Sequence, residues 1–334
     1  MCPFAKNLVI RIIVIVIHLA LFVEAGAALA QPSIEKNRNF RIGVLLGGSA
    51  ATSGRYVDTL RESLRALGYV DGQSIVIETR YALGDFGRMP ALANELVDLK
   101  VNLIVATNEP ALIAAKGTRT PIPIVAVACD PLDRLVGNLA RPGGNATGVT
   151  CVSGDLVGKR LGYLKTLVPN LKRVAFLYSA ADDIDSELRG AEQAGRVLGV
   201  TTVRFPVRTP EDFAVAFDSM LRQDCQALYI SVSSFTNFHR QRFADLALTY
   251  RLPSIYGFPE FPEAGGLISY GATLSDAFKR VAYFVDRILK GVSPKDLPVE
   301  EPTKFYLIVN AKTAKALGIK IPDLILIQAD TIIN

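Results

Sequence analysis

The run RIGVLL at residues 41–46 decides the fold, because the pattern that it opens starts again with RVAFLY at residues 173–178. Both runs are apolar without strict alternation, which is typical of a parallel strand buried on both faces. A helix-length amphipathic stretch follows each run and ends near a Leu-Gly pair, Leu67-Gly68 in the first case and Leu198-Gly199 in the second. Glycine is favoured directly after a helix. We therefore interpret the chain as two copies of one βαβαβ unit.

Strand-length and helix-length segments alternate throughout both copies. Strands separated by helices indicate parallel sheets. A single sheet of about twelve strands is the alternative, and it is disfavoured because sheets of that size are rare. The predicted fold is therefore α/β, with two Rossmann-like lobes that each contain a parallel sheet. The remaining predicted strands are 74–79, 102–107, 122–127, 201–205 and 227–231, and the predicted helices of the first copy are 55–67, 86–99 and 110–116.

Three extended segments are expected to link the lobes. They are residues 141–152, 265–271 and 303–309, which combine turn residues with short apolar runs. A helix over 274–289 follows the second segment. Three linking strands form a hinge that bends without unfolding either lobe. The predicted boundaries are residues 40–149 plus 272–300 for the first lobe and 150–268 plus 305–334 for the second.

The N-terminus has the features of an export signal. Lys6 and Arg11 precede an apolar run of 12 residues, 12–23, and the small-residue triplet Ala28-Leu29-Ala30 follows. This order predicts a signal peptide over residues 1–30 and a mature, periplasmic chain that starts at Gln31. An uncleaved anchor is disfavoured, because the run is shorter than the ~20 residues that span a bilayer. Cys2 precedes the run, so a lipoprotein anchor is not expected.

Composition argues against several classes of function. The net charge of +5 comes from Lys and Arg residues mixed with Asp and Glu, which is typical of a solvated surface and not of a nucleic-acid-binding face. After residue 30 the only histidine is His239, which we expect on the solvated surface, so neither a His-based metal site nor a Ser-His-Asp triad is expected. The turn GGS at 47–49 does not match the dinucleotide fingerprint. We expect no catalytic residues, metal or cofactor.

Cysteines give a weak signal. Cys129, Cys151 and Cys225 remain after the predicted cleavage site. An oxidising compartment permits a bridge between Cys129 and Cys151, but buried free thiols are the favoured interpretation.

Hydroxyl and aromatic residues gather where the predicted strands end. Open α/β sheets bind ligands at the carboxyl ends of their strands, so these residues should line a cleft between the lobes. Hydroxyls suit a carboxylate, an acidic side chain suits an amine, and aromatic rings supply a wall. The residues predicted to contact a ligand are Ser49, Thr107, Asp130, Tyr178, Ser179, Ser233, Tyr256 and Tyr270.

Asp130 is the predicted acidic contact. Pro131 follows it and disfavours helical backbone at residue 130. Its carboxylate is expected to pair with a ligand amine or to hold a hydroxyl-bearing loop. Helix capping and a hinge salt bridge are equally open interpretations.

Four short motifs together resemble one known family. They are LGY at 67–69 with Gly72-Gln73, RPGGN at 141–145 with TGV at 147–149, FPEAGGL at 261–267 with SYG at 269–271, and PTKF at 302–305 before Asn310. Over residues 40–332 the chain resembles the ABC transporter substrate-binding proteins of the tryptophan/tyrosine type, which have the type I periplasmic binding fold.

This resemblance implies a solute receptor without catalytic activity. Its partners would be a small molecule, such as an amino acid or related carboxylate, and an inner-membrane ABC permease with a cytoplasmic ATPase. The chain itself would be a monomer. One departure is the loop SAADD at 179–183, where members often have a Gly- or Asn-rich loop, and it argues against an aromatic amino acid. A sensor that reports its ligand to a membrane-bound signalling partner is the alternative function.

Overall fold

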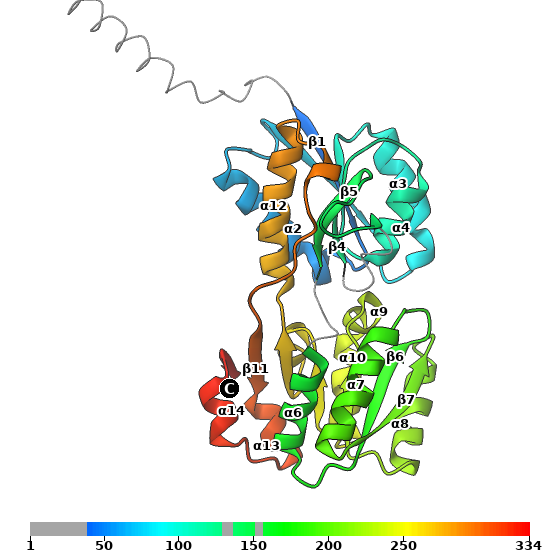
Figure 1. The fold of residues 1–334 in the computed structure, drawn as a ribbon, viewed down its shortest axis with the longest axis vertical. Coiled ribbons are helices and arrows are strands. Elements are labelled where there is room, and N and C mark those ends of the chain that lie inside the picture. Colours follow the sequence, from blue (N-terminus) through cyan, green and yellow to red (C-terminus); the bar gives the residue numbers. More distant parts are fainter. Residues whose placement is uncertain (1–38, 129–135, 151–155) are drawn as a thin grey trace, which may run out of the picture. The chain divides into compact units, whose positions relative to one another are not determined.

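The computed structural model describes residues 39–128, 136–150 and 156–334. It contains two α/β lobes, each built on its own sheet (Figure 1). The first sheet has five strands in the order β2-β1-β3-β4-β5, and the second has seven in the order β12-β11-β10-β9-β8-β6-β7. The predicted two-lobed α/β fold is confirmed.

The first sheet is parallel throughout, and the helices that follow β1, β2 and β3 return the chain to the same edge. Alternate residues of β1 pack on opposite faces: Val44 contacts the core under α2 and α12, whereas Leu45 contacts the core under α3 and α4. Figure 1 shows these two helix layers on either side of the sheet. The elements are β1 (Phe40–Leu46), α2 (Ala50–Ala66), β2 (Ile75–Tyr81), η1 (Phe86–Arg88), α3 (Met89–Asp98), β3 (Leu103–Ala106), α4 (Glu109–Gly117), β4 (Ile124–Ala128), β5 (Ala146–Thr150), α12 (Leu274–Leu289) and η3 (Pro294–Asp296).

The second sheet repeats this plan. Phe176 of β6 packs in the core under α6 and α7, and Leu177 packs in the core with α8, α10 and α11. All strand pairs are parallel except β10 with β11. The elements are α6 (Val157–Leu167), β6 (Arg173–Ser179), α7 (Asp185–Leu198), β7 (Thr201–Val207), α8 (Asp212–Arg222), β8 (Ala227–Ile230), α9 (Ser234–Phe238), α10 (Arg240–Thr249), β9 (Ser254–Tyr256), α11 (Glu260–Glu263), β10 (Ile268–Gly271), β11 (Tyr306–Asn310), α13 (Ala311–Leu317), α14 (Asp323–Gln328) and β12 (Thr331–Ile333).

The chain passes between the lobes after β5, after β10 and before β11. The strands predicted as linkers are themselves members of the sheets, because their apolar residues are buried against neighbouring strands. Residues 146–150, 268–271 and 306–309 therefore belong to the sheets. Two of the links are held together: Thr150 N donates to Glu300 O at 2.9 Å, and Glu300 N donates to Gly148 O at 3.0 Å.

Helix α2 begins at Ala50, earlier than the predicted start at residue 55. The reason is a capping box, in which the Ser49 side chain accepts from Thr52 N and the Thr52 side chain accepts from Ser49 N. This cap carries the helix through Ser53 and Gly54, which read as loop in the sequence. Within the described ranges no helix has both the length and the apolar character needed to cross a bilayer.

Candidate functional site

A cavity of about 760 Å³ lies at the carboxyl ends of strands from both sheets. Leu46 and Gly47 line it at the end of β1, and Thr107 follows β3. From the second lobe, Ser179 lies at the end of β6 and Val232 follows β8. This is the edge at which parallel α/β sheets bind ligands, and the volume suits a small molecule.

Six aromatic rings line the cavity, and both lobes supply them. The Tyr56 ring of α2 stacks on Phe278 of α12, with 5.4 Å between the ring centroids. Such rings provide a large apolar contact area, so the cavity suits a ligand with an apolar body. The six are Tyr56, Phe86, Phe235, Phe238, Phe258 and Phe278.

Acidic side chains outnumber basic ones in the cavity lining, five to two. Glu187 pairs with the buried Arg160 guanidinium at 3.6 Å, which leaves four other carboxylates against two guanidinium groups among the described lining residues, so the cavity favours a positively charged group. The carboxylates belong to Asp85, Glu109, Asp182, Asp183 and Glu187, and the guanidinium groups belong to Arg208 and Arg240.

Asp182 lies in the loop between β6 and α7 and is partly buried. Its Oδ2 atom is buried and accepts no hydrogen bond from any described residue. Burial raises the pKa of the Asp182 carboxyl, and the hydroxyls of Ser233 and Ser179 partly offset this rise. The Oδ1 atom of Asn237, another cavity residue, is also buried without a donor in the described part of the chain. The second lobe thus presents two unused acceptors.

The first lobe presents the N-termini of two helices. Thr52 and Ser53 of α2 line the cavity. Asn108 caps α4, and its Oδ1 accepts from Ala111 N at 2.8 Å. Helix N-termini carry a partial positive charge and suit the negative end of a ligand.

Three of the residues predicted from the sequence line the cavity: Thr107, Ser179 and Ser233. Their hydroxyls also form hydrogen bonds within the protein. Thr107 Oγ1 donates to Leu45 O at 3.0 Å, and Ser179 Oγ accepts from Ala181 N at 3.3 Å. Ser233 caps α9 through a capping box with Thr236. These contacts fix the strand ends at the cavity wall.

Four other predicted residues are not among the described residues that line the cavity. Ser49 caps α2. Tyr178 packs against Phe176. Tyr256 is fully buried and donates to Ser254 Oγ at 2.7 Å, and the Tyr270 hydroxyl accepts from Lys159 Nζ at 3.1 Å.

Asp130, Cys129 and Cys151 lie outside the described residues. Cys225 is a buried free thiol.

The sequence analysis expected His239 on the solvated surface, and this prediction is wrong. His239 is partly buried against the rings of Phe235 and Phe238, with centroid distances of 4.8 and 4.9 Å. Burial lowers the pKa of its imidazole. The residue helps to hold these two cavity-lining rings in place.

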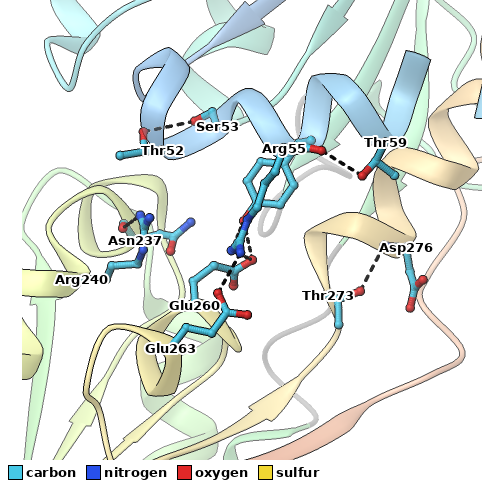
Figure 2. A network of polar contacts seen from close by, with 11 residues as sticks. Thr52, Ser53, Arg55, Thr59, Asn237, Arg240, Glu260, Glu263, Thr273 and Asp276 are labelled. Atoms are coloured by element: carbon cyan, nitrogen blue, oxygen red, sulfur yellow. Dashed lines mark hydrogen bonds and ion pairs between the residues drawn. The ribbon is translucent and has the colours of Figure 1, made fainter. Parts of the chain in front are cut away.

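A polar bridge joins the lobes beside the cavity (Figure 2). Arg55 of α2 donates to Glu263 Oε2 at 2.8 Å and lies 3.1 Å from Glu260 Oε1. The Tyr56 hydroxyl also donates to Glu260 Oε1. Glu260 is buried, and that burial raises the pKa of its carboxyl. Tyr56 also lines the cavity, so one residue belongs both to the bridge and to the cavity lining.

A second contact between the lobes is apolar. Gly84 of the first lobe has φ of +84°, and the Phe238 ring of the second lobe lies against its backbone. A Cβ at position 84 would lie 2.3 Å from Phe238 Cε1. Glycine is therefore required both for the backbone conformation and for the approach of the ring.

The sequence analysis missed Asp182, Asn237 and the phenylalanine rings as cavity residues. For Asp182 a signal was present, since the acidic pair in SAADD was visible as a departure from the family pattern. For Phe86, Phe235, Phe238 and Phe258 there was none, because they lie on loops and short helices whose position depends on tertiary packing.

Comparison with known proteins places this architecture in one family. The sequence profile described as ABC transporter substrate binding protein matches residues 42–333. A search among curated proteins returns no significant match.

Three solved structures are similar across 88% of this chain. One is the ABC domain in complex with L-Trp from Streptococcus pneumoniae, with 24% identity, a TM-score of 0.81 and 100% of that chain covered. Another is a conserved domain protein from Vibrio cholerae, with 21% identity, a TM-score of 0.81 and 100% coverage. The third is a ligand-free, open substrate-binding protein from Clostridium difficile, with 23% identity, a TM-score of 0.66 and 99% coverage. The profile match spans both lobes, and the chain therefore belongs to the ABC transporter substrate-binding protein family.

Proposed function

We propose that the protein captures a small solute outside the cytoplasmic membrane and delivers it to an ABC permease driven by a cytoplasmic ATPase. The observation that carries this proposal is the cavity at the strand ends of both lobes. A ligand there contacts both lobes at once, so it stabilises the arrangement in which they touch. The protein would act as a monomer, after removal of a signal peptide at Ala30, in the periplasm.

The proposed ligand is an amino acid or a related carboxylate. The N-termini of α2 and α4 supply partial positive charge for a carboxylate. The aromatic rings suit an apolar side chain. The similar structure from Streptococcus pneumoniae holds L-Trp, which makes amino acids the first class to test. Asp130 remains a proposed contact.

Mass spectrometry of the material released from the purified, unfolded protein tests this proposal. We expect one small molecule in near-stoichiometric amount, bearing a carboxylate. The matched control is the same protein after unfolding, dialysis and refolding, which should release nothing until the molecule is added back. A released ligand without a carboxylate would contradict the ligand class. Conversion of the added ligand to a product would contradict the receptor role.

A further inference from the structure

We infer that Asp182 anchors a protonated amino group of the solute, so that the cavity selects ligands that carry an ammonium group. This inference rests on the proposed function and deepens it, because a carboxylate alone would not need such an anchor. It concerns a residue of the second lobe, whereas the proposed carboxylate contacts lie mainly in the first.

The first step concerns a carboxylate oxygen of Asp182 that lacks a hydrogen-bond donor. Asp182 Oδ2 is buried, lines the cavity and has no donor among the residues that the structure describes. Buried polar atoms are nearly always hydrogen-bonded, because an unpaired one costs folding free energy. An ionised carboxylate only accepts hydrogen bonds, so the missing partner is a donor. In a ligand-binding cavity, that donor comes with the ligand.

The second step is the charge of the donor. Apart from Glu187, which pairs with the buried Arg160, the described cavity lining has four carboxylates and two guanidinium groups, so it favours a cation over a neutral hydroxyl. Asp182 forms no ion pair with any residue that the structure describes, and Arg240 donates instead to the Asn237 carbonyl at 2.9 Å. Burial of the carboxyl strengthens its attraction for a cation. A protonated amine satisfies both the charge and the missing hydrogen bond.

The third step is the geometry around the anchor. Asn237 Oδ1 is a second buried acceptor in the same cavity without a donor in the described ranges. An ammonium group has three N–H donors, more than one carboxylate oxygen accepts. Aromatic rings line the same cavity, and their faces attract cations. The amine therefore meets acceptors and ring faces together.

Calorimetric titration with matched sets of three probes tests the inference. Each set removes one group at a time: L-phenylalanine, 3-phenylpropionate and 2-phenylethylamine form one set, and L-leucine, 4-methylpentanoate and 3-methylbutylamine form another. We expect the wild type to bind an amino acid at least tenfold tighter than the acid that lacks its amine. Asp182→Asn should weaken that amino acid about ten- to hundredfold and remove the preference for the amine.

Asp185→Asn is the matched control, because Asp185 is an exposed carboxylate at the start of α7. It should keep both the wild-type affinity and the wild-type preference. Asp182→Ser gives a second variant that lacks the carboxylate and should behave like Asp182→Asn.

The probe sets separate this inference from the proposed function. Equal affinity for an amino acid and its amine-free acid, or an unchanged preference in Asp182→Asn, would overturn the amine anchor and leave the carboxylate receptor standing. Binding of the amine alone, as tight as the amino acid, would support the anchor and contradict the proposed carboxylate. Binding of no probe in either set would contradict both.

Discussion

At the scale of single residues, the Asp182 carboxylate is expected to favour ligand binding but to lower the stability of the ligand-free protein. Its Oδ2 atom is buried without a donor from the described chain, and burial raises the pKa of the carboxyl. A carboxyl with a raised folded-state pKa holds its proton more tightly in the folded than in the unfolded protein. Its contribution to stability is therefore fully present below the unfolded-state pKa and lost as pH rises through the folded-state pKa. The empty site is destabilised at neutral pH.

Asp182→Asn should therefore stabilise the ligand-free protein at pH 7. The expected gain in the free energy of unfolding is about 1 kcal/mol, since a buried charge is removed whose Oδ2 atom has no donor among the described residues. The gain should shrink as the pH falls from 7 through the raised pKa of the wild-type carboxyl, because that carboxyl then takes up a proton. Urea unfolding of the ligand-free protein across this pH range measures it.

The exposed Asp185→Asn variant should change little over the same pH range. A loss of stability in Asp182→Asn at pH 7 would show that the carboxylate is well satisfied in the empty protein. The same variant should weaken amino-acid binding, so one substitution moves stability and affinity in opposite directions.

At the scale of elements, the sequence predicts the fold because burial on both faces leaves a clear mark. The repeated runs at 41–46 and 173–178 correspond to β1 and β6, which occupy equivalent places: β1 lies between β2 and β3, and β6 lies between β7 and β8. The helix predicted over 274–289 is α12, whose apolar stripe packs on the first sheet. The predicted boundaries of elements are less accurate. Helix α2, for example, begins earlier than predicted because Ser49 caps it.

The candidate site is harder to predict, because a strand end says nothing about which way its last side chains point. Tyr256 ends β9, but its ring faces the core and stacks on Phe261, with 4.2 Å between the centroids. The rings of Phe86 and Phe238 enter the cavity from short helical segments instead. Their position follows from packing between segments far apart in sequence, which local pattern does not reveal.

At the scale of the whole molecule, two of the contacts between the described parts of the lobes lie at the cavity or directly beside it. One is the polar bridge from Arg55 and Tyr56 to the carboxylates of Glu260 and Glu263, shown in Figure 2. The other is the Phe238 ring against Gly84. Both involve residues at the cavity wall or directly beside it, so ligand binding and contact between the lobes are expected to be coupled.

Gly84→Ala should weaken the coupling between ligand binding and contact of the lobes, and Gly72→Ala is its matched control. Both glycines have positive φ, +84° and +80°, so either substitution should cost about 1–2 kcal/mol of stability. Only at Gly84 would the new Cβ meet the other lobe, 2.3 Å from Phe238, whereas nothing lies within 4 Å at Gly72. Calorimetric titration with the ligand released from the wild type should show about tenfold weaker binding for Gly84→Ala alone. Equal affinity in the two variants would contradict the coupling.

The most direct test of the central claim, a receptor whose lobes close on a solute, is small-angle X-ray scattering. The sample is the protein after unfolding, dialysis and refolding, measured without ligand and again with a saturating amount of the molecule identified by mass spectrometry. A ligand that contacts both lobes favours the closed arrangement, so the radius of gyration should fall when it is added. An unchanged radius of gyration at saturating ligand would contradict closure of the lobes on the solute.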